Sequence, residues 1–233
     1  MNKYSTILFD LDMTILDFDR CERDALKEAF TAFGINPDDE LLKSYHEINK
    51  ACWKELELKL IDRGELAVKR FRITLLQNNI KGIDPVELGD CYKKNLAQYA
   101  YFMPGAKEML KDAASKYKLY LITNGSTIIQ NSRIKIAGIS DLFEDIFISE
   151  SIGHDKPSVE FFDCIRNRIA ENDLSKMLIV GDSLSSDIKL GINVGIDTVL
   201  FDCKDRLDKQ TKCAESTYQV NGYCELRRLL NDL

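Results

Sequence analysis

The sequence predicts an α/β protein, a doubly wound parallel sheet whose chain is interrupted by an inserted four-helix bundle. After Pro104, helix-like and strand-like segments alternate, which is typical of parallel strands joined by helical crossovers. Between residues 17 and 99 the apolar residues recur only at helical spacing. We therefore expect an α/β core domain of residues 1–16 and 100–233, and a helical domain of residues 17–99 inserted after the first strand.

The first strand is the apolar run Ile7-Leu8-Phe9, which ends abruptly in Asp10 and Asp12. A short apolar run between polar residues fits a strand buried on both faces of a parallel sheet. Ligands of such sheets bind beyond the carboxyl ends of the strands, so both aspartates fall where a reacting group would sit. Two carboxylates at this place need a cation or hydrogen-bond donors. This requirement suggests a metal site, and the alternative is a strand followed by an acidic turn.

The inserted segment contains four amphipathic helices. Gly34 suits the left-handed position that ends the first helix. Asn36 is expected to cap the second helix, with Pro37 as its first residue, and Asp62-Arg63-Gly64 to end it. A third helix follows, and the capping box Asp84-Pro85-Val86-Glu87 opens the fourth.

The rest of the core alternates between the two types of element. The expected helices cover residues 106–117 and 128–137, a segment holding Phe161, Phe162 and Ile165, and a segment rich in small residues that precedes Thr198. The expected strands after the first cover residues 118–122, 146–148, 177–180 and 198–201, with an edge strand at 218–220.

Polar residues follow three of these strands. Thr123-Asn124-Gly125-Ser126 forms a small turn before a helix, where a hydroxyl and free backbone N–H groups can hold an anion. Lys156 begins the helix after the third strand, and Asp182 and Asp187 follow the fourth. Each feature alone is common in ordinary turns and helix caps. Their occurrence in order on one sheet edge predicts a site for phosphate and a metal ion.

These residues match four motifs, and the sequence resembles the haloacid dehalogenase-like hydrolases over its whole length. Asp10-Leu11-Asp12-Met13-Thr14 matches D-x-D-x-T, Thr123-Asn124 the threonine turn, Lys156-Pro157 the lysine motif, and Gly181-Asp182 to Asp187 the motif G-D-x-x-x-x-D. The resemblance implies a Rossmannoid core with a four-helix cap between the first two motifs. Met13 is a departure, because a polar residue or glycine is commoner at that position.

The resemblance also implies a mechanism, an aspartyl-phosphate phosphatase. Asp10 would be the nucleophile, and Asp12 would protonate the leaving oxygen and then activate water. Mg²⁺ would be held by Asp10, the Asp12 carbonyl and Asp182, while Asp187 supports the metal's waters or Lys156. The residues expected to bind phosphate are Leu11, Asp12, Thr123, Asn124 and Lys156.

Substrate choice is assigned to the cap, which resembles that of nucleoside 5'-monophosphatases. Phe18, Asn49, Trp53 and Arg70 are the residues expected to recognise the leaving group, although Trp53 could equally belong to the interior of the cap. The expected substrate is a nucleoside 5'-monophosphate. The alternatives are a sugar phosphate or phosphoglycolate phosphatase, a metal-independent 2-haloacid dehalogenase, and a catalytically silent binding module on the same fold.

Composition narrows the class of protein. A net charge of -6 and a pI near 5.1 argue against a partner that is a nucleic acid polymer or an anionic membrane. The seven cysteines include no C-x-x-C pair, so we expect reduced buried thiols rather than disulfides. The N-terminal sequence shows no signal peptide or membrane span, and we expect a cytoplasmic monomer or weak dimer.

Overall fold

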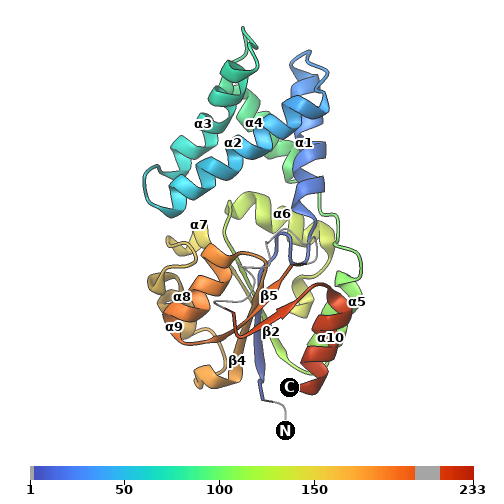
Figure 1. The fold of residues 1–233 in the computed structure, drawn as a ribbon, viewed down its shortest axis with the longest axis vertical. Coiled ribbons are helices and arrows are strands. Elements are labelled where there is room, and N and C mark those ends of the chain that lie inside the picture. Colours follow the sequence, from blue (N-terminus) through green and yellow to red (C-terminus); the bar gives the residue numbers. More distant parts are fainter. Residues whose placement is uncertain (1–2, 203–215) are drawn as a thin grey trace. The chain divides into compact units, whose positions relative to one another are not determined.

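The computed structural model describes residues 3–202 and 216–233, which form two compact units. One unit comprises Met1–Phe18 with Ala100–Leu233, and the other comprises Asp19–Tyr99. The predicted insert of residues 17–99 is longer than the second unit by two residues at its N-terminal end. Figure 1 shows the elements of each unit.

The first unit contains a six-stranded parallel sheet in the order β3-β2-β1-β4-β5-β6. The α/β fold class predicted from the sequence is confirmed. The strands are β1 (Thr6–Phe9), β2 (Lys118–Thr123), β3 (Asp145–Ile148), β4 (Met177–Gly181), β5 (Asp197–Phe201) and β6 (Tyr218–Val220). Each predicted strand is present, and β6 is an edge strand as expected.

Helices cover both faces of this sheet (Figure 1). They are α5 (Ala106–Ala114), α6 (Thr127–Ala137), α7 (Ser149–Ile152), α8 (Val159–Arg166), α9 (Lys189–Val194) and α10 (Tyr223–Asp232), with a π-helical turn at Leu184–Ile188. The helix expected to reach residue 117 ends at Ala114, because the N–H groups of Lys116 and Tyr117 both turn back to the Ala113 carbonyl.

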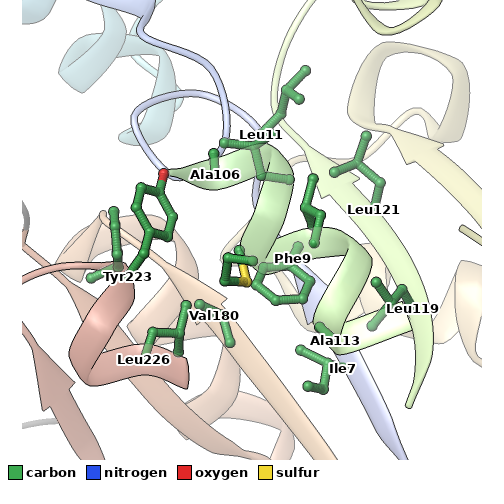
Figure 2. Close-up of a cluster of buried hydrophobic side chains, with 14 of the residues drawn as sticks. Ile7, Phe9, Leu11, Ala106, Ala113, Leu119, Leu121, Val180, Tyr223 and Leu226 are labelled. Carbon is green, nitrogen blue, oxygen red and sulfur yellow. The ribbon is translucent and has the colours of Figure 1, made fainter. Parts of the chain in front are cut away.

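Alternation along β1 divides the core between the two faces of the sheet. Ile7 and Phe9 pack into a cluster with α5 and α10, whereas Leu8 packs into a second cluster with Phe161 and Phe162 of α8. The side chains of Ile7, Leu8 and Phe9 are completely buried. Figure 2 shows the first cluster, in which Phe9 lies among side chains of the neighbouring strands and helices. An uninterrupted apolar run suits this strand because apolar side chains cover it on both faces of the sheet.

The second unit contains α1 from Asp19 onward (the helix spans Phe18–Ala32), α2 (Asp39–Glu57), α3 (Arg63–Gln77) and α4 (Pro85–Leu96). Gly34 follows α1 with a φ of 78°, in the left-handed region as expected. Asp84 caps α4 by accepting a hydrogen bond from the Val86 N–H.

Two helix boundaries in this unit were predicted wrongly. The cap of α2 is Asp38, not Asn36, and its carboxylate accepts a 2.8 Å hydrogen bond from the Leu41 N–H. A charged acceptor suits the positive end of the helix dipole better than a neutral amide. Asp62 does not end α2, which stops at Glu57. It caps α3 by accepting from the Glu65 N–H.

The cysteine prediction is correct in part. Cys21, Cys52, Cys91, Cys164 and Cys224 are all free thiols, but Cys164 and Cys224 are exposed rather than buried. Cys203 and Cys213 lie outside the described residues. Within residues 3–202 and 216–233, every helix is either too short or too polar to serve as a membrane span.

Candidate active site

The predicted motifs meet at the carboxyl edge of the sheet. β1 lies between β2 and β4, so the chain leaves its central strand in one direction and later returns on the other side. Asp10 follows β1 directly, Thr123 is the last residue of β2, and Asp182 follows β4. The Asp10 N–H donates to the Val180 carbonyl, which fixes the backbone of Asp10 against β4. This reversal of strand order is the usual position of ligand sites in open α/β sheets.

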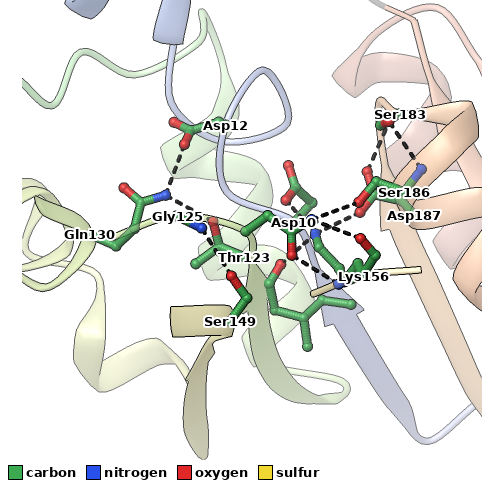
Figure 3. A network of polar contacts seen from close by, with 12 residues as sticks. Asp10, Asp12, Thr123, Gly125, Gln130, Ser149, Lys156, Ser183, Ser186 and Asp187 are labelled. Carbon is green, nitrogen blue, oxygen red and sulfur yellow. Dashed lines mark hydrogen bonds and ion pairs between the residues drawn. The ribbon is translucent and has the colours of Figure 1, made fainter. Parts of the chain in front are cut away.

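Lys156 is the centre of a buried ion-pair network at this edge. Its ammonium lies 2.7 Å from an Asp10 oxygen and 2.7 Å from an Asp187 oxygen, and it donates to the Ile122 carbonyl at 2.9 Å. The Lys156 side chain is 1% exposed. Figure 3 shows the two aspartates on either side of the ammonium. Lys156 therefore joins the first and fourth motifs, although it comes from the third.

Burial and neighbouring charges shift the pKa values of Asp10 and Lys156 in this network. Burial raises the pKa of the Asp10 carboxyl well above its ordinary range, Asp187 and Asp182 act in the same direction, and Lys156 opposes them. Burial alone would lower the pKa of Lys156, but the carboxylates of Asp10 and Asp187 outweigh it and the Lys156 pKa is raised. Lys156 thus stays protonated, while ionisation of Asp10 has an energetic cost.

Three carboxylates in this group could hold a metal ion. Asp10, Asp182 and Asp187 each offer an oxygen, and these oxygens lie within 4.8 Å of one another. Oxygen ligands of this type suit Mg²⁺. Asp10 and Asp187 share the ammonium of Lys156, and the charges of Asp182 and Asp187 raise the pKa of Asp10, so an added divalent cation would reduce the repulsion among the carboxylates. The residues present fit Mg²⁺.

Asp187 is held in place by the turn after β4. Its second oxygen accepts a 3.1 Å hydrogen bond from the Ser183 N–H, and its side chain is 1% exposed. Gly181 makes room for it: a Cβ at Gly181 would lie 2.3 Å from Cγ of Asp187. The glycine of the fourth motif is therefore required by the position of its last aspartate.

Hydrogen-bonding groups of the turn after β2 that were expected to bind an anion already have partners within the protein. The Asn124 amide accepts from the Lys156 N–H at 3.0 Å and donates to the Lys156 carbonyl at 2.9 Å, so it anchors the Lys156 backbone. The Gly125 N–H, which was expected to be free for an anion, donates to Ser149, and the N–H of the following Thr127 donates to Glu150. They are satisfied because the short helix α7 places its own polar side chains beside the start of α6.

Asp12 lies beside α6, where two residues that the sequence analysis did not select contact it. Gln130 donates to one Asp12 oxygen at 2.9 Å, and the Arg133 guanidinium lies 2.7 Å from the other. Gln130 also donates to the Thr123 hydroxyl at 2.9 Å. In Figure 3 the Asp12 side chain is turned toward Gln130, away from Asp10 and Lys156. Gln130, Arg133 and Ile134 share the buried face of α6, which the sequence does not mark because the apolar residues Ile128 and Ile136 are exposed.

The turn that carries Asp12 explains why glycine or a polar residue is commoner at the position of Met13. Met13 has a φ of 63°, a left-handed conformation that is costly for residues with a side chain. Its N–H donates to Leu16, and the Leu11 carbonyl accepts from Ile15 and Leu16, so the turn closes on itself. The Leu11 side chain is fully buried in the core. Backbone conformation is what this position requires, and the buried Met13 side chain adds packing to it.

Two of the residues assigned to substrate recognition lie in the interior of the second unit. Arg70 is 6% exposed and donates to the Asn49 side chain at 3.0 Å. Asn49 in turn donates at 2.7 Å to Glu22, whose carboxylate also lies 2.8 Å from a ring nitrogen of His46. The Arg70 guanidinium is surrounded by the Tyr45, Phe71 and Tyr92 rings. These contacts make a buried polar network, and substrate contact by Arg70 or Asn49 stays a prediction.

Trp53 and Phe18 have different surroundings. Trp53 is partly buried against the apolar cluster of Cys52, Ile61 and Leu66, and the Arg63 guanidinium lies 5.9 Å from the centre of its ring. Phe18 belongs to the first unit, where its ring centre lies 5.5 Å from the Arg133 guanidinium. Their predicted contact with a leaving group stays a prediction.

Comparisons with known proteins agree with this geometry. Residues 7–201 match the sequence model of the haloacid dehalogenase-like hydrolases. The chain is 38% identical to the pyrimidine 5'-nucleotidase PynA of Streptococcus pneumoniae over 96% of this chain and 93% of that protein. It is 29% identical to the pyrimidine 5'-nucleotidase YjjG of Escherichia coli, with 98% of each chain covered.

A solved structure extends the likeness to three dimensions. The magnesium-bound crystal structure of the HAD-hydrolase YfnB from Bacillus subtilis superimposes with a TM-score of 0.91 and 31% identity, covering 98% of this chain and 99% of that one. The family match therefore includes both the strand that carries Asp10 and the turn that carries Asp182 and Asp187. This chain belongs to the haloacid dehalogenase-like hydrolases.

Proposed function

We propose that this protein is a Mg²⁺-dependent phosphomonoester hydrolase that acts on nucleoside 5'-monophosphates through an aspartyl-phosphate intermediate. The observation that carries the proposal is the position of Asp10, beside Lys156 and within a cluster of three carboxylates. The substrate class is supported by the two relatives named as pyrimidine 5'-nucleotidases.

In the proposed reaction Asp10 attacks phosphorus and forms an acyl phosphate, which water then hydrolyses. Lys156 neutralises charge beside the nucleophile and orients its carboxylate. Asp12 donates a proton to the leaving oxygen and then accepts one from the attacking water. Asp10, the Asp12 carbonyl and Asp182 would hold Mg²⁺, which reduces the repulsion between a carboxylate and an anionic phosphate.

A phosphate-release screen tests the proposal. The purified protein is assayed with Mg²⁺ and with chelator on nucleoside 5'-monophosphates, sugar phosphates, phosphoglycolate and p-nitrophenyl phosphate, and 2-chloropropionate is tested for halide release. We expect Mg²⁺-dependent turnover that is fastest on nucleotides. If turnover is fastest on sugar phosphates or phosphoglycolate, the proposed nucleotide substrate is wrong. Halide release that resists chelator would show a metal-independent dehalogenase instead of a phosphatase. No turnover on any compound would indicate a binding module.

The variant Asp10→Asn tests the role of the nucleophile. The substitution keeps the volume of the side chain and removes the attacking carboxylate, so turnover should fall to background while circular dichroism is unchanged. Substantial activity of this variant on the best substrate of the screen would contradict nucleophilic catalysis by Asp10.

A further inference from the structure

We propose that Gln130 and Arg133 are positioning residues that hold the Asp12 carboxylate for its acid and base steps. The proposal rests on the proposed phosphatase reaction and names two residues of α6 that act in it through Asp12. All of the residues involved lie in the first unit. They are Asp12, Phe18, Thr123, Gln130 and Arg133.

Both oxygens of Asp12 face α6: Oδ1 forms an ion pair there but is buried without a hydrogen bond, and Oδ2 accepts one hydrogen bond. Arg133 Nη1 lies 2.7 Å from Asp12 Oδ1, and Gln130 Nε2 lies 2.9 Å from Asp12 Oδ2. A general acid must have its carboxyl group within hydrogen-bond distance of the leaving oxygen, so the orientation of the group controls the rate. Two contacts from one rigid helix define that orientation.

The orientation of the Gln130 amide is itself determined. Its oxygen accepts a 2.9 Å hydrogen bond from Arg133, which leaves its nitrogen to donate to Asp12 and to the Thr123 hydroxyl. The reversed amide would place an acceptor against the Asp12 carboxylate and a donor against the guanidinium. Gly125 makes space for this side chain, because a Cβ there would lie 3.0 Å from Gln130 Nε2.

The burial of Arg133 indicates that its contact with Asp12 does more than fill space in the core. Its side chain is fully buried, and taking a guanidinium out of water is expensive unless a carboxylate and further contacts compensate. Asp12, by contrast, is 25% exposed and therefore accessible to a leaving group. A buried cation can therefore hold the buried side of the Asp12 carboxylate while the exposed side stays open to a leaving group.

The two oxygens of Asp12 differ in their surroundings, which assigns a role to each. Asp12 Oδ1 is buried against the Arg133 guanidinium, whereas Oδ2 accepts a hydrogen bond from the neutral amide of Gln130. We assign Oδ2 as the oxygen that leaves Gln130 and carries the proton. It gives this proton to the ester oxygen as the phosphorus–oxygen bond breaks and Asp10 bonds to phosphorus. It then takes a proton from the water that splits the acyl phosphate and releases inorganic phosphate.

The test uses two substrates with the same phosphoryl group and different leaving groups. An alkyl ester such as a nucleoside 5'-monophosphate needs a proton on its leaving oxygen, whereas p-nitrophenolate leaves without one. Arg133→Met should slow the single-turnover formation of phosphoenzyme from the nucleotide by roughly a hundredfold or more, and from p-nitrophenyl phosphate by less than about fivefold. The variant should also show a burst of p-nitrophenolate followed by slow turnover, because the hydrolysis step still needs Asp12 as a base.

Controls separate positioning from folding. Arg133→Lys keeps the charge and should recover part of the loss, and Gln130→Leu should show the same substrate difference at roughly tenfold. Lys135→Met changes an exposed residue on the other face of α6 and should match the wild type. Gln130→Leu and Arg133→Lys supply the comparison if Arg133→Met does not fold.

The outcomes distinguish this inference from the proposed function. A wild-type protein without activity on any phosphomonoester overturns the proposed function itself. An active wild type with variants that lose both substrates equally, or lose neither, overturns the positioning role and leaves the phosphatase assignment intact.

Discussion

At the scale of single residues, Gly181 has the strictest requirement in the site. A methyl group at this position would occupy the space of the Asp187 carboxylate, which contacts Lys156. Gly181→Ala should therefore abolish most turnover and lower the free energy of unfolding by about 1–3 kcal/mol, as overpacking of a core does. Urea unfolding and phosphate release measure the two effects.

Gly222→Ala is the matched control, because nothing lies within 4 Å of the added Cβ and the residue has an extended φ of 167°. We expect it to retain wild-type activity. An active Gly181→Ala protein would show that Asp187 can move without loss of function.

The raised pKa of Asp10 leads to a prediction about metal and pH. Without metal, native Asp10 takes up a proton at a pH where the unfolded chain has released it, so its contribution to stability falls as pH rises above the ordinary value near 4. Mg²⁺ binding needs the ionised carboxylate. Mg²⁺ should therefore raise the Tm more at pH 8 than at pH 5.5, and Asp182→Asn should reduce both shifts. Equal shifts at the two pH values would contradict a site that contains Asp10.

Among the residues, the sequence predicted those that follow strands and missed those within helices. Asp10, Thr123 and Asp182 stand at the ends of apolar runs, and a parallel sheet brings such ends together whatever the details of packing. Gln130 and Arg133 lie inside a helix whose apolar residues Ile128 and Ile136 are exposed. The hydrophobic pattern of α6 therefore gave no indication that its polar residues face inward.

At the scale of elements, the second unit contains a titratable pair between α1 and α2. Glu22 is almost fully buried, and its hydrogen bond raises the pKa of His46. The pair lies beside a cavity of about 420 Å³ that is also lined by Asp19, Arg23 and Lys43. Stability contributed by His46 is present below its unfolded pKa near 6.5 and is lost as pH rises through the raised folded value.

We expect wild-type stability to fall between pH 6 and pH 8.5 by more than that of His46→Gln. The difference should be below about 1 kcal/mol, because His46 is 45% exposed and the interaction is partly screened. Urea unfolding at the two pH values measures it. His154→Gln, at the other, exposed histidine, should behave like the wild type. Parallel pH profiles of wild type and His46→Gln would show that the pair contributes nothing.

Helix boundaries were the least predictable part of the elements. Several acids near Asn36 and Asp62 offered alternative caps, and the choice depends on which carboxylate meets a free N–H after packing. The strands had no such competition, since each apolar run was bounded by polar residues on both sides.

At the scale of the whole molecule, the insert is joined to the core by two segments that pair with each other. Asp17 donates to the Tyr101 carbonyl, Leu16 and Phe102 form an antiparallel bridge, and Met103 donates to Ile15. The chain therefore leaves and re-enters the core at adjacent points.

Replacing residues 19–99 by a short Gly-Ser linker should leave a folded core. We expect cooperative unfolding and a Mg²⁺-dependent rise in Tm, because the three carboxylates and Lys156 all belong to the first unit. Hydrolysis of p-nitrophenyl phosphate should persist, and any preference for nucleotides should disappear. Calorimetry and the substrate screen measure both. A shortened chain that stays unfolded would show that the core needs the insert for stability, and a retained nucleotide preference would place specificity in the core.

The central position of β1 also determines the order in which the chain can fold. Ile7 pairs with Leu119 and Leu178, which are synthesised 112 and 171 residues later. At roughly 5–20 residues per second, a nascent chain waits on the order of ten to thirty seconds before β4 exists. During this interval the helices of the insert can already pack together. The strand that precedes Asp10 is thus made before both of its partners, so it stays unpaired until β2 has been made and is paired on one side only until β4 follows.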